Sequence, residues 1–224
     1  HFSSRQQLDD YERFEQFHKL NRDSAYYYAK RLVNDIDTLA TSMEVAMLYD
    51  FMAEYTEATL HSYSKSLEYR LQSARIYEAL DNKPCITRTN ALLARIYLRN
   101  GDYHNAFSYS TSALKSAKSL SDVTSEREAY LVLEQVTYFY NNDIDLAMEY
   151  NHLVADSYEG REQAHQTVRA LNNRFNYSMS YDETLELTLL AETLCKEYGF
   201  SDLLINIYLN ASMQSLAYEE FEMS

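Results

Sequence analysis

The chain has 224 residues, of which 46% are hydrophobic, 34 are acidic and 20 are basic, and its formal net charge is −14. Because nucleic-acid binding relies on Lys and Arg to neutralise phosphates, this charge argues against nucleic acid, or an anionic membrane surface, as the main partner. Only 3 Gly and 1 Pro occur beside 22 Tyr, which argues against a hairpin-rich β fold and favours long helices packed through tyrosines.

Apolar residues recur at helical spacing along the whole chain, beginning with Leu8, Tyr11 and Phe14. This periodicity predicts eleven helices, arranged as five pairs and one further helix. The predicted helices cover 4–19, 23–36, 40–60, 63–80, 84–100, 103–119, 122–141, 144–158, 160–178, 181–198 and 201–219.

The rare helix-breaking residues fall near the predicted helix ends. Pro84 opens a helix, where its missing N–H costs nothing. Gly101 is predicted to form the turn within a pair, and Gly160 and Gly199 are predicted to end helices in the left-handed conformation. The predicted N-caps are Ser121, Asp182 and Asp202. With all three glycines in these roles, none is left for a phosphate-binding loop.

A short phrase recurs six times: an aromatic or apolar residue, two further residues, a small residue and then a large apolar residue. The small residues of the copies are Ala25, Ser66, Ala106, Ala147, Thr184 and Ser224, which are separated by 41, 40, 41, 37 and 40 residues. A fixed period of this size predicts a solenoid in which each repeat contacts only its neighbours. We therefore expect residues 1–224 to form a single all-α array of about five and a half repeats, with about 40 residues per repeat.

The last predicted helix, 201–219, has no second helix to complete its pair. Its predicted apolar side consists of Leu203, Leu204, Ile207, Tyr208 and Ala211. Large soluble surfaces avoid such faces. We expect the parent protein to continue with further repeats, which would make this chain a fragment; a docked second copy is the alternative.

The third repeat, residues 93–107, resembles the tetratricopeptide repeat (TPR) family. It has that family's Leu-small pair, the tyrosine three residues on, the Gly-Asp-Tyr turn and the small residues of the second helix. The matching residues are Ala94, Tyr97, Gly101, Tyr103, Ala106 and Ala113. The other repeats lack the glycine and are longer than the roughly 34 residues of the standard repeat. The resemblance implies a right-handed superhelical solenoid of antiparallel helix pairs that binds a protein or peptide and does no catalysis.

In repeat length, tyrosine content and helix starts such as residues 23–28, the chain resembles the TPR arrays of Bacteroidetes regulatory proteins. Those arrays lie outside the inner membrane, ahead of a membrane helix and a DNA-binding or kinase module. This resemblance implies the sensor or interaction region of a transcription regulator or sensor kinase, and it favours a periplasmic over a cytoplasmic location. Two alternatives stay open: a cytoplasmic peptide-sensing regulator, and an assembly scaffold that dimerises through its C-terminal repeat.

TPR arrays bind ligands along the groove lined by the first helix of each repeat, which directs attention to Arg88, Arg95 and Arg99. Their spacing of seven and four places them on one helix face. One interpretation is that they hold a carboxylate of a peptide ligand through bidentate hydrogen bonds. The other is that they pair with acidic residues of the preceding first helix, which are Asp50, Glu54 and Glu57.

Two further sets of residues on first helices are candidates for the groove. Val132, Val136 and Tyr140 would floor an apolar pocket, or else pack between repeats. Arg169, Asn173, Asn176 and Tyr177 would form a polar face that reads a peptide backbone, or else a solvated helix face.

No catalytic motif, and no zinc-ligand spacing among the six histidines and two cysteines, is present in the sequence. We therefore expect no enzyme activity, no metal and no cofactor. Cys85 and Cys195 are 110 residues apart, which a solenoid separates too widely for a disulfide.

Overall fold

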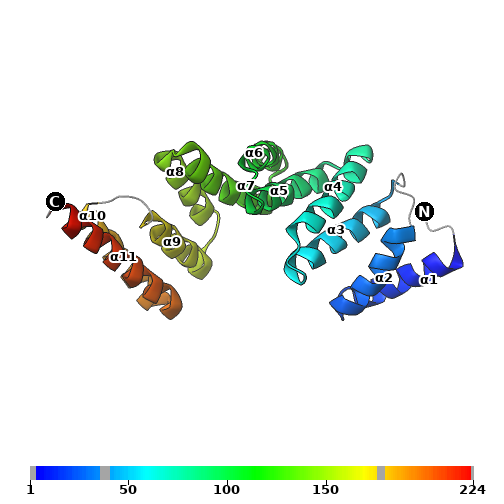
Figure 1. The fold of residues 1–224 in the computed structure, drawn as a ribbon, viewed down its shortest axis with the longest axis horizontal. Coiled ribbons are helices and arrows are strands. Elements are labelled where there is room, and N and C mark those ends of the chain that lie inside the picture. The colour runs from blue at the N-terminus through cyan, green and yellow to red at the C-terminus, as the bar shows by residue number, and fades with distance from the viewer. Residues whose placement is uncertain (1–3, 36–40, 176–179, 223–224) are drawn as a thin grey trace. The chain divides into compact units, whose positions relative to one another are not determined.

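The computed structural model describes residues 4–35, 41–175 and 180–222, and side chains as far as residue 216. Within these ranges the chain forms eleven α-helices and one π-helical turn, with no strand. Consecutive helices pack against one another, as Figure 1 shows for α3 with α4 and for α5 with α6. The predicted fold class, an all-α solenoid of helix pairs, is therefore confirmed.

The observed helices start and end within a few residues of the predicted positions. They are α1 (Arg5–Phe17), α2 (Arg22–Asp35), α3 (Met43–Ala58), α4 (Tyr63–Ala79), α5 (Lys83–Arg99), α6 (Tyr103–Leu120), α7 (Val123–Val136), α8 (Ile144–Asp156), α9 (Gly160–Arg174), α10 (Tyr181–Tyr198) and α11 (Ser201–Glu222).

The predicted array of residues 1–224 divides into two compact units, His1–Val132 and Leu133–Ser224. The first unit holds α1 to α6 and most of α7. Its core is built around Phe14, Leu32, Leu48, Met52 and Ile76, all of them buried. The second unit holds the end of α7 and α8 to α11, and its core includes Val168, Ala191, Cys195 and Ile207.

The small residues of the repeated phrase are buried wherever the structure describes them. Ala25, Ser66, Ala106 and Ala147 are completely buried, and Thr184 is nearly so. The Ser66 hydroxyl donates to the backbone oxygen of Ala53 over 3.0 Å, so a second helix approaches the first to hydrogen-bonding distance. A larger side chain would hold the helices apart, which explains the phrase. Ser224 lies outside the described residues.

Gly199 ends α10 in the predicted left-handed conformation, with φ of 74°, and Gly101 lies in the predicted turn between α5 and α6, with φ of 76°. Gly160 also adopts the predicted left-handed conformation, with φ of 56°, but it opens α9 instead of ending α8 as predicted. Ser121 is not an N-cap; it ends α6 in the left-handed conformation, and Asp122 accepts the hydrogen bond from the Ser125 N–H that caps α7.

The two other predicted N-caps are also misplaced by one or two residues. Asp182 lies in the first turn of α10, whose cap is Ser180. Asp202 lies in the first turn of α11. Both carboxylates still sit where the positive end of the helix dipole favours them.

The last predicted turn of helix 122–141 is wrong in type. The α-helix ends at Val136, and residues Thr137–Asn141 form a π-helical turn that closes on Asn142, with φ of 52°. A π turn holds more residues than an α turn, so it changes the direction of each side chain that follows. Tyr140, which an α-helix would place on the same face as Val136, is exposed.

Candidate functional site

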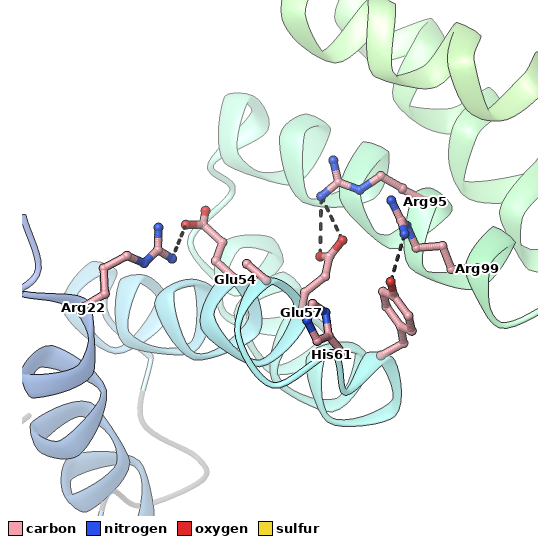
Figure 2. Close-up of a pocket in the computed structure, with 8 residues that line it drawn as sticks. Arg22, Glu54, Glu57, His61, Arg95 and Arg99 are labelled. Atoms are coloured by element: carbon pink, nitrogen blue, oxygen red, sulfur yellow. Dashed lines mark hydrogen bonds and ion pairs between the residues drawn. The ribbon is translucent and has the colours of Figure 1, made fainter. Parts of the chain in front are cut away.

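The first unit has an open pocket of about 400 Å³ over α3 and α5, which Figure 2 shows in close-up. Four consecutive helices and one loop supply its lining. The lining residues are Arg22 of α2, Glu54, Glu57 and Ala58 of α3, His61 of the following loop, Tyr63 of α4, and Arg95 and Arg99 of α5. Two of the three predicted arginines therefore line a single pocket.

Arg95 is the most enclosed of these cations, and it is held by two carboxylates. Its guanidinium lies 3.3 Å from Glu57 of α3 and 3.3 Å from Glu128 of α7. Its Nε is buried and has no hydrogen-bond partner among the described residues. Arg95 therefore links three successive first helices, and one of its donors remains unused.

Arg99 differs, because no carboxylate among the described side chains pairs with it. It donates from Nη1 to the Tyr63 hydroxyl over 2.9 Å, and its guanidinium carbon lies 5.3 Å from the centroid of the Tyr63 ring. Figure 2 shows this contact at the edge of the pocket. The tyrosine orients the guanidinium without neutralising it, and Arg99 is exposed.

Arg22 and Arg88 share Glu54, at 3.9 and 3.4 Å. Both arginines are more than half exposed, so these pairs contribute little to stability and are easily exchanged for a ligand. Arg88, the third of the arginines predicted for the groove, does not line the pocket.

Asp50, the third expected acidic partner, does not reach the arginines of α5. It accepts from Arg70 Nη1 over 2.8 Å and from the Tyr77 hydroxyl over 2.7 Å, and so fastens α4 onto α3. Burial and the neighbouring Asp50 carboxylate raise the pKa of Tyr77, so this hydroxyl stays a donor. The pairing interpretation is therefore confirmed for Arg88 with Glu54 and for Arg95 with Glu57, but not for Asp50 or Arg99.

The pocket therefore contains three guanidinium groups and two carboxylates, and its lining has a charge of +1 when His61 is neutral. This is a local positive site on a chain of net charge −14. Charge-assisted, bidentate hydrogen bonds are what a guanidinium offers to a carboxylate. The arrangement can hold an anionic group against α5.

The predicted apolar pocket finds no support in the positions of its residues. Val132 and Val136 are buried to within 2% of their surface, and Tyr140 is 62% exposed. The valines present no surface to a ligand, and the π-helical turn directs Tyr140 to solvent.

In the predicted polar face, Arg169 is exposed and Asn173 is engaged within the protein. Its amide donates to Glu134 over 3.2 Å, and the amide of Asn151 donates to the same oxygen over 3.1 Å. Burial raises the pKa of Glu134, although the two amides and Arg169 oppose this effect. Asn173 thus satisfies a buried carboxylate. Asn176 and Tyr177 lie outside the described residues.

Sequence reasoning missed Arg22 and Tyr63, yet the repeat carries a signal for them. Each stands three residues before the small residue of its copy, Ala25 and Ser66, so the two occupy the same repeat position. Superposing the repeats would have placed both at the start of a second helix, on successive repeats. The burial of Glu134 had no comparable signal, because an isolated Glu on a helix is ordinarily exposed.

Among the described residues, no three His, Cys, Asp or Glu side chains gather as a metal site would require. In the same ranges, no helix combines the length and the apolar character needed to cross a membrane. Cys85 and Cys195 are both free thiols, half-buried and buried respectively.

No protein-family model matches the chain, and no curated protein is significantly similar to it in sequence.

Proposed function

We propose that this chain is a non-catalytic, peptide-binding helical array that forms the sensor or interaction region of a larger regulatory protein, such as a transcription regulator or sensor kinase. The ligand group at the pocket over α3 and α5 is a carboxylate of a peptide or protein, either a C-terminus or an acidic side chain.

One observation carries this proposal: Arg99 is exposed, oriented by Tyr63 and paired with no described carboxylate. Arg95 lies one helical turn away and has an unused buried donor. A carboxylate placed against the exposed Arg99 guanidinium would complete hydrogen bonds that the protein alone leaves open.

The mechanism would be a change in the connections between helices. A carboxylate that engages Arg95 competes with Glu57 and Glu128, which link α5 to α3 and α7. Binding would thereby alter how firmly consecutive first helices are held, and a ligand with unequal affinity for two arrangements shifts their populations.

The test is binding of a fluorescent acidic peptide with a free C-terminus, measured by polarisation with the intact chain. We expect Arg99→Ala to weaken binding at least tenfold. Arg99→Lys should restore only part of the affinity, because Lys lacks the bidentate geometry. Arg5→Ala, an exposed charge change on α1, is the matched control and should leave the affinity unchanged.

A peptide with its carboxylates amidated should bind much more weakly. Equal affinity for the amidated peptide, or equal loss in the Arg5 and Arg99 variants, would show that the pocket does not recognise a carboxylate.

A second candidate function, assembly through the C-terminal repeat, is favoured by the surface of α11. The predicted apolar side packs inward at Ile207 and Ala211, while Ile205, Leu209 and Met213 are all more than half exposed. Sedimentation of the chain over a hundredfold concentration range, with Leu209→Glu as the variant, tests this candidate. A monomer at every concentration would contradict it.

A further inference from the structure

The second unit contains a separate, largely apolar pocket of about 290 Å³ between α8, α9 and α10. Each helix presents one face to it. The lining residues are Met148, Asn151, His152 and Ala155 of α8, Thr167, Ala170, Leu171 and Arg174 of α9, and Glu183, Leu187 and Leu190 of α10.

Small side chains leave this space open. Ala155 and Ala170 stand on facing helices at positions where a leucine would fill the pocket. Protein interiors are close-packed, with few voids larger than a water molecule, and ligand pockets begin at roughly 300 Å³. The volume of this pocket is therefore close to the lower limit for a small-ligand site.

The polar groups of the lining restrict the chemistry of that occupant. Arg174 and Glu183 form an ion pair at 2.7 Å, so their opposite charges compensate each other. The Thr167 hydroxyl donates to the Gln163 backbone, and the Asn151 amide donates to Glu134. The Thr167 hydroxyl oxygen and the Asn151 carbonyl oxygen can each accept a hydrogen bond from a ligand.

We propose that this pocket binds a small uncharged molecule with an apolar body and one hydrogen-bond donor, such as a hydroxyl group. The apolar body lies against Met148, Leu171 and Leu187, and the donor reaches the acceptors of Thr167 or Asn151. This site is independent of the arginine pocket, and it does not rest on the proposed peptide binding.

The experiment uses the intact chain, labelled with ¹³C at the methionine methyl groups, and 1-octanol as the probe. The chain has seven methionines, and the Met148 signal is identified by its loss in the Met148→Leu variant. We expect octanol to shift the Met148 signal saturably and to raise the melting temperature.

Ala170→Leu fills the pocket, and we expect it to abolish the octanol response while leaving the melting temperature unchanged or raised. That stability readout distinguishes a filled pocket from a misfolded variant. Ala79→Leu, at an exposed alanine of α4 in the first unit, is the matched control and should keep the full response.

An unchanged Met148 signal at saturating octanol, or an equal response in the Ala170 variant, would overturn the proposal. A response to N-acetyl-leucine amide but not to octanol would also overturn it, because the pocket would then accept a peptide side chain instead of a free molecule.

Discussion

Asp50 shows how a residue that resembles a ligand-binding group can serve the fold instead. Arg70 is 1% exposed, and two of its nitrogens, Nε and Nη2, have no partner in the described structure. The Asp50 carboxylate is therefore the charge that makes burial of this guanidinium tolerable.

We predict that Asp50→Asn destabilises the protein by about 3–5 kcal/mol, because a buried guanidinium loses its counter-charge. Tyr77→Phe removes only one hydrogen bond to the same carboxylate and should cost about 1.5 kcal/mol. Urea unfolding monitored by circular dichroism measures both. Similar small losses for the two variants would mean that Arg70 finds another partner.

For Glu134 we predict the opposite effect to that for Asp50, because the buried charge of Glu134 lowers the stability of the folded state. Its pKa is raised by burial, so the folded state binds the proton more tightly than the unfolded state. The stability gained from this tighter proton binding is fully present below the pKa of the carboxyl in the unfolded chain. It is lost as the pH rises through the pKa of the carboxyl in the folded chain. Each tenfold difference in proton affinity corresponds to about 1.4 kcal/mol.

Glu134→Gln keeps the oxygen that accepts from Asn151 and Asn173 but removes the charge. We expect the variant to be more stable than the parent chain at pH 7.5, with the difference vanishing near pH 4. Urea titrations across this range, compared at equal ionic strength, provide the measurement. A variant that is less stable at every pH would show that the carboxylate is needed for packing.

At the scale of the elements, the small residue of each repeat sets the distance between paired helices. We predict that Ser66→Leu, at a completely buried position, costs at least 1–3 kcal/mol through overpacking. Ser64→Leu, on the exposed side of the same helix, should change the stability by less than about 0.5 kcal/mol. If the two substitutions lowered the melting temperature equally, the small residue would not set the distance between the paired helices.

The helices and the contacts between paired helices were predictable because both follow from a periodic pattern that many residues share. The positions of individual caps were less so: Ser180 and Asp122 cap helices, while Asp182 and Ser121, their neighbours, had the same propensity. The spacing of apolar residues does not indicate the π-helical turn at Thr137–Asn141.

The candidate site was predictable only in outline. Helical spacing brought Arg95 and Arg99 together, but which arginine would be neutralised depended on the reach of carboxylates from other helices. Glu128, which completes the coordination of Arg95, lies 33 residues further along the chain. Pairings between repeats of this kind follow from three-dimensional packing, which a single helix pattern does not contain.

At the scale of the whole molecule, contacts are local, because the helices that pack together are close in the sequence. In such arrays, damage spreads mainly to neighbouring repeats. We predict that Asp50→Asn lowers hydrogen-exchange protection in α3 and α4 but leaves α10 as protected as in the parent chain. Mass spectrometry of deuterium uptake gives this map, and a uniform loss along the chain would indicate a single cooperative unit.

The contact between Arg99 and Tyr63 also has an optical consequence. The chain has 22 Tyr and no Trp, so Tyr63→Trp would introduce a single indole chromophore directly beneath the guanidinium. The exchange removes the hydroxyl that accepts from Arg99 but keeps an aromatic face, and tryptophan offers a cation the strongest such face. Its emission could then be excited selectively and would report, in real time and without a label, each event that draws Arg99 away from the ring.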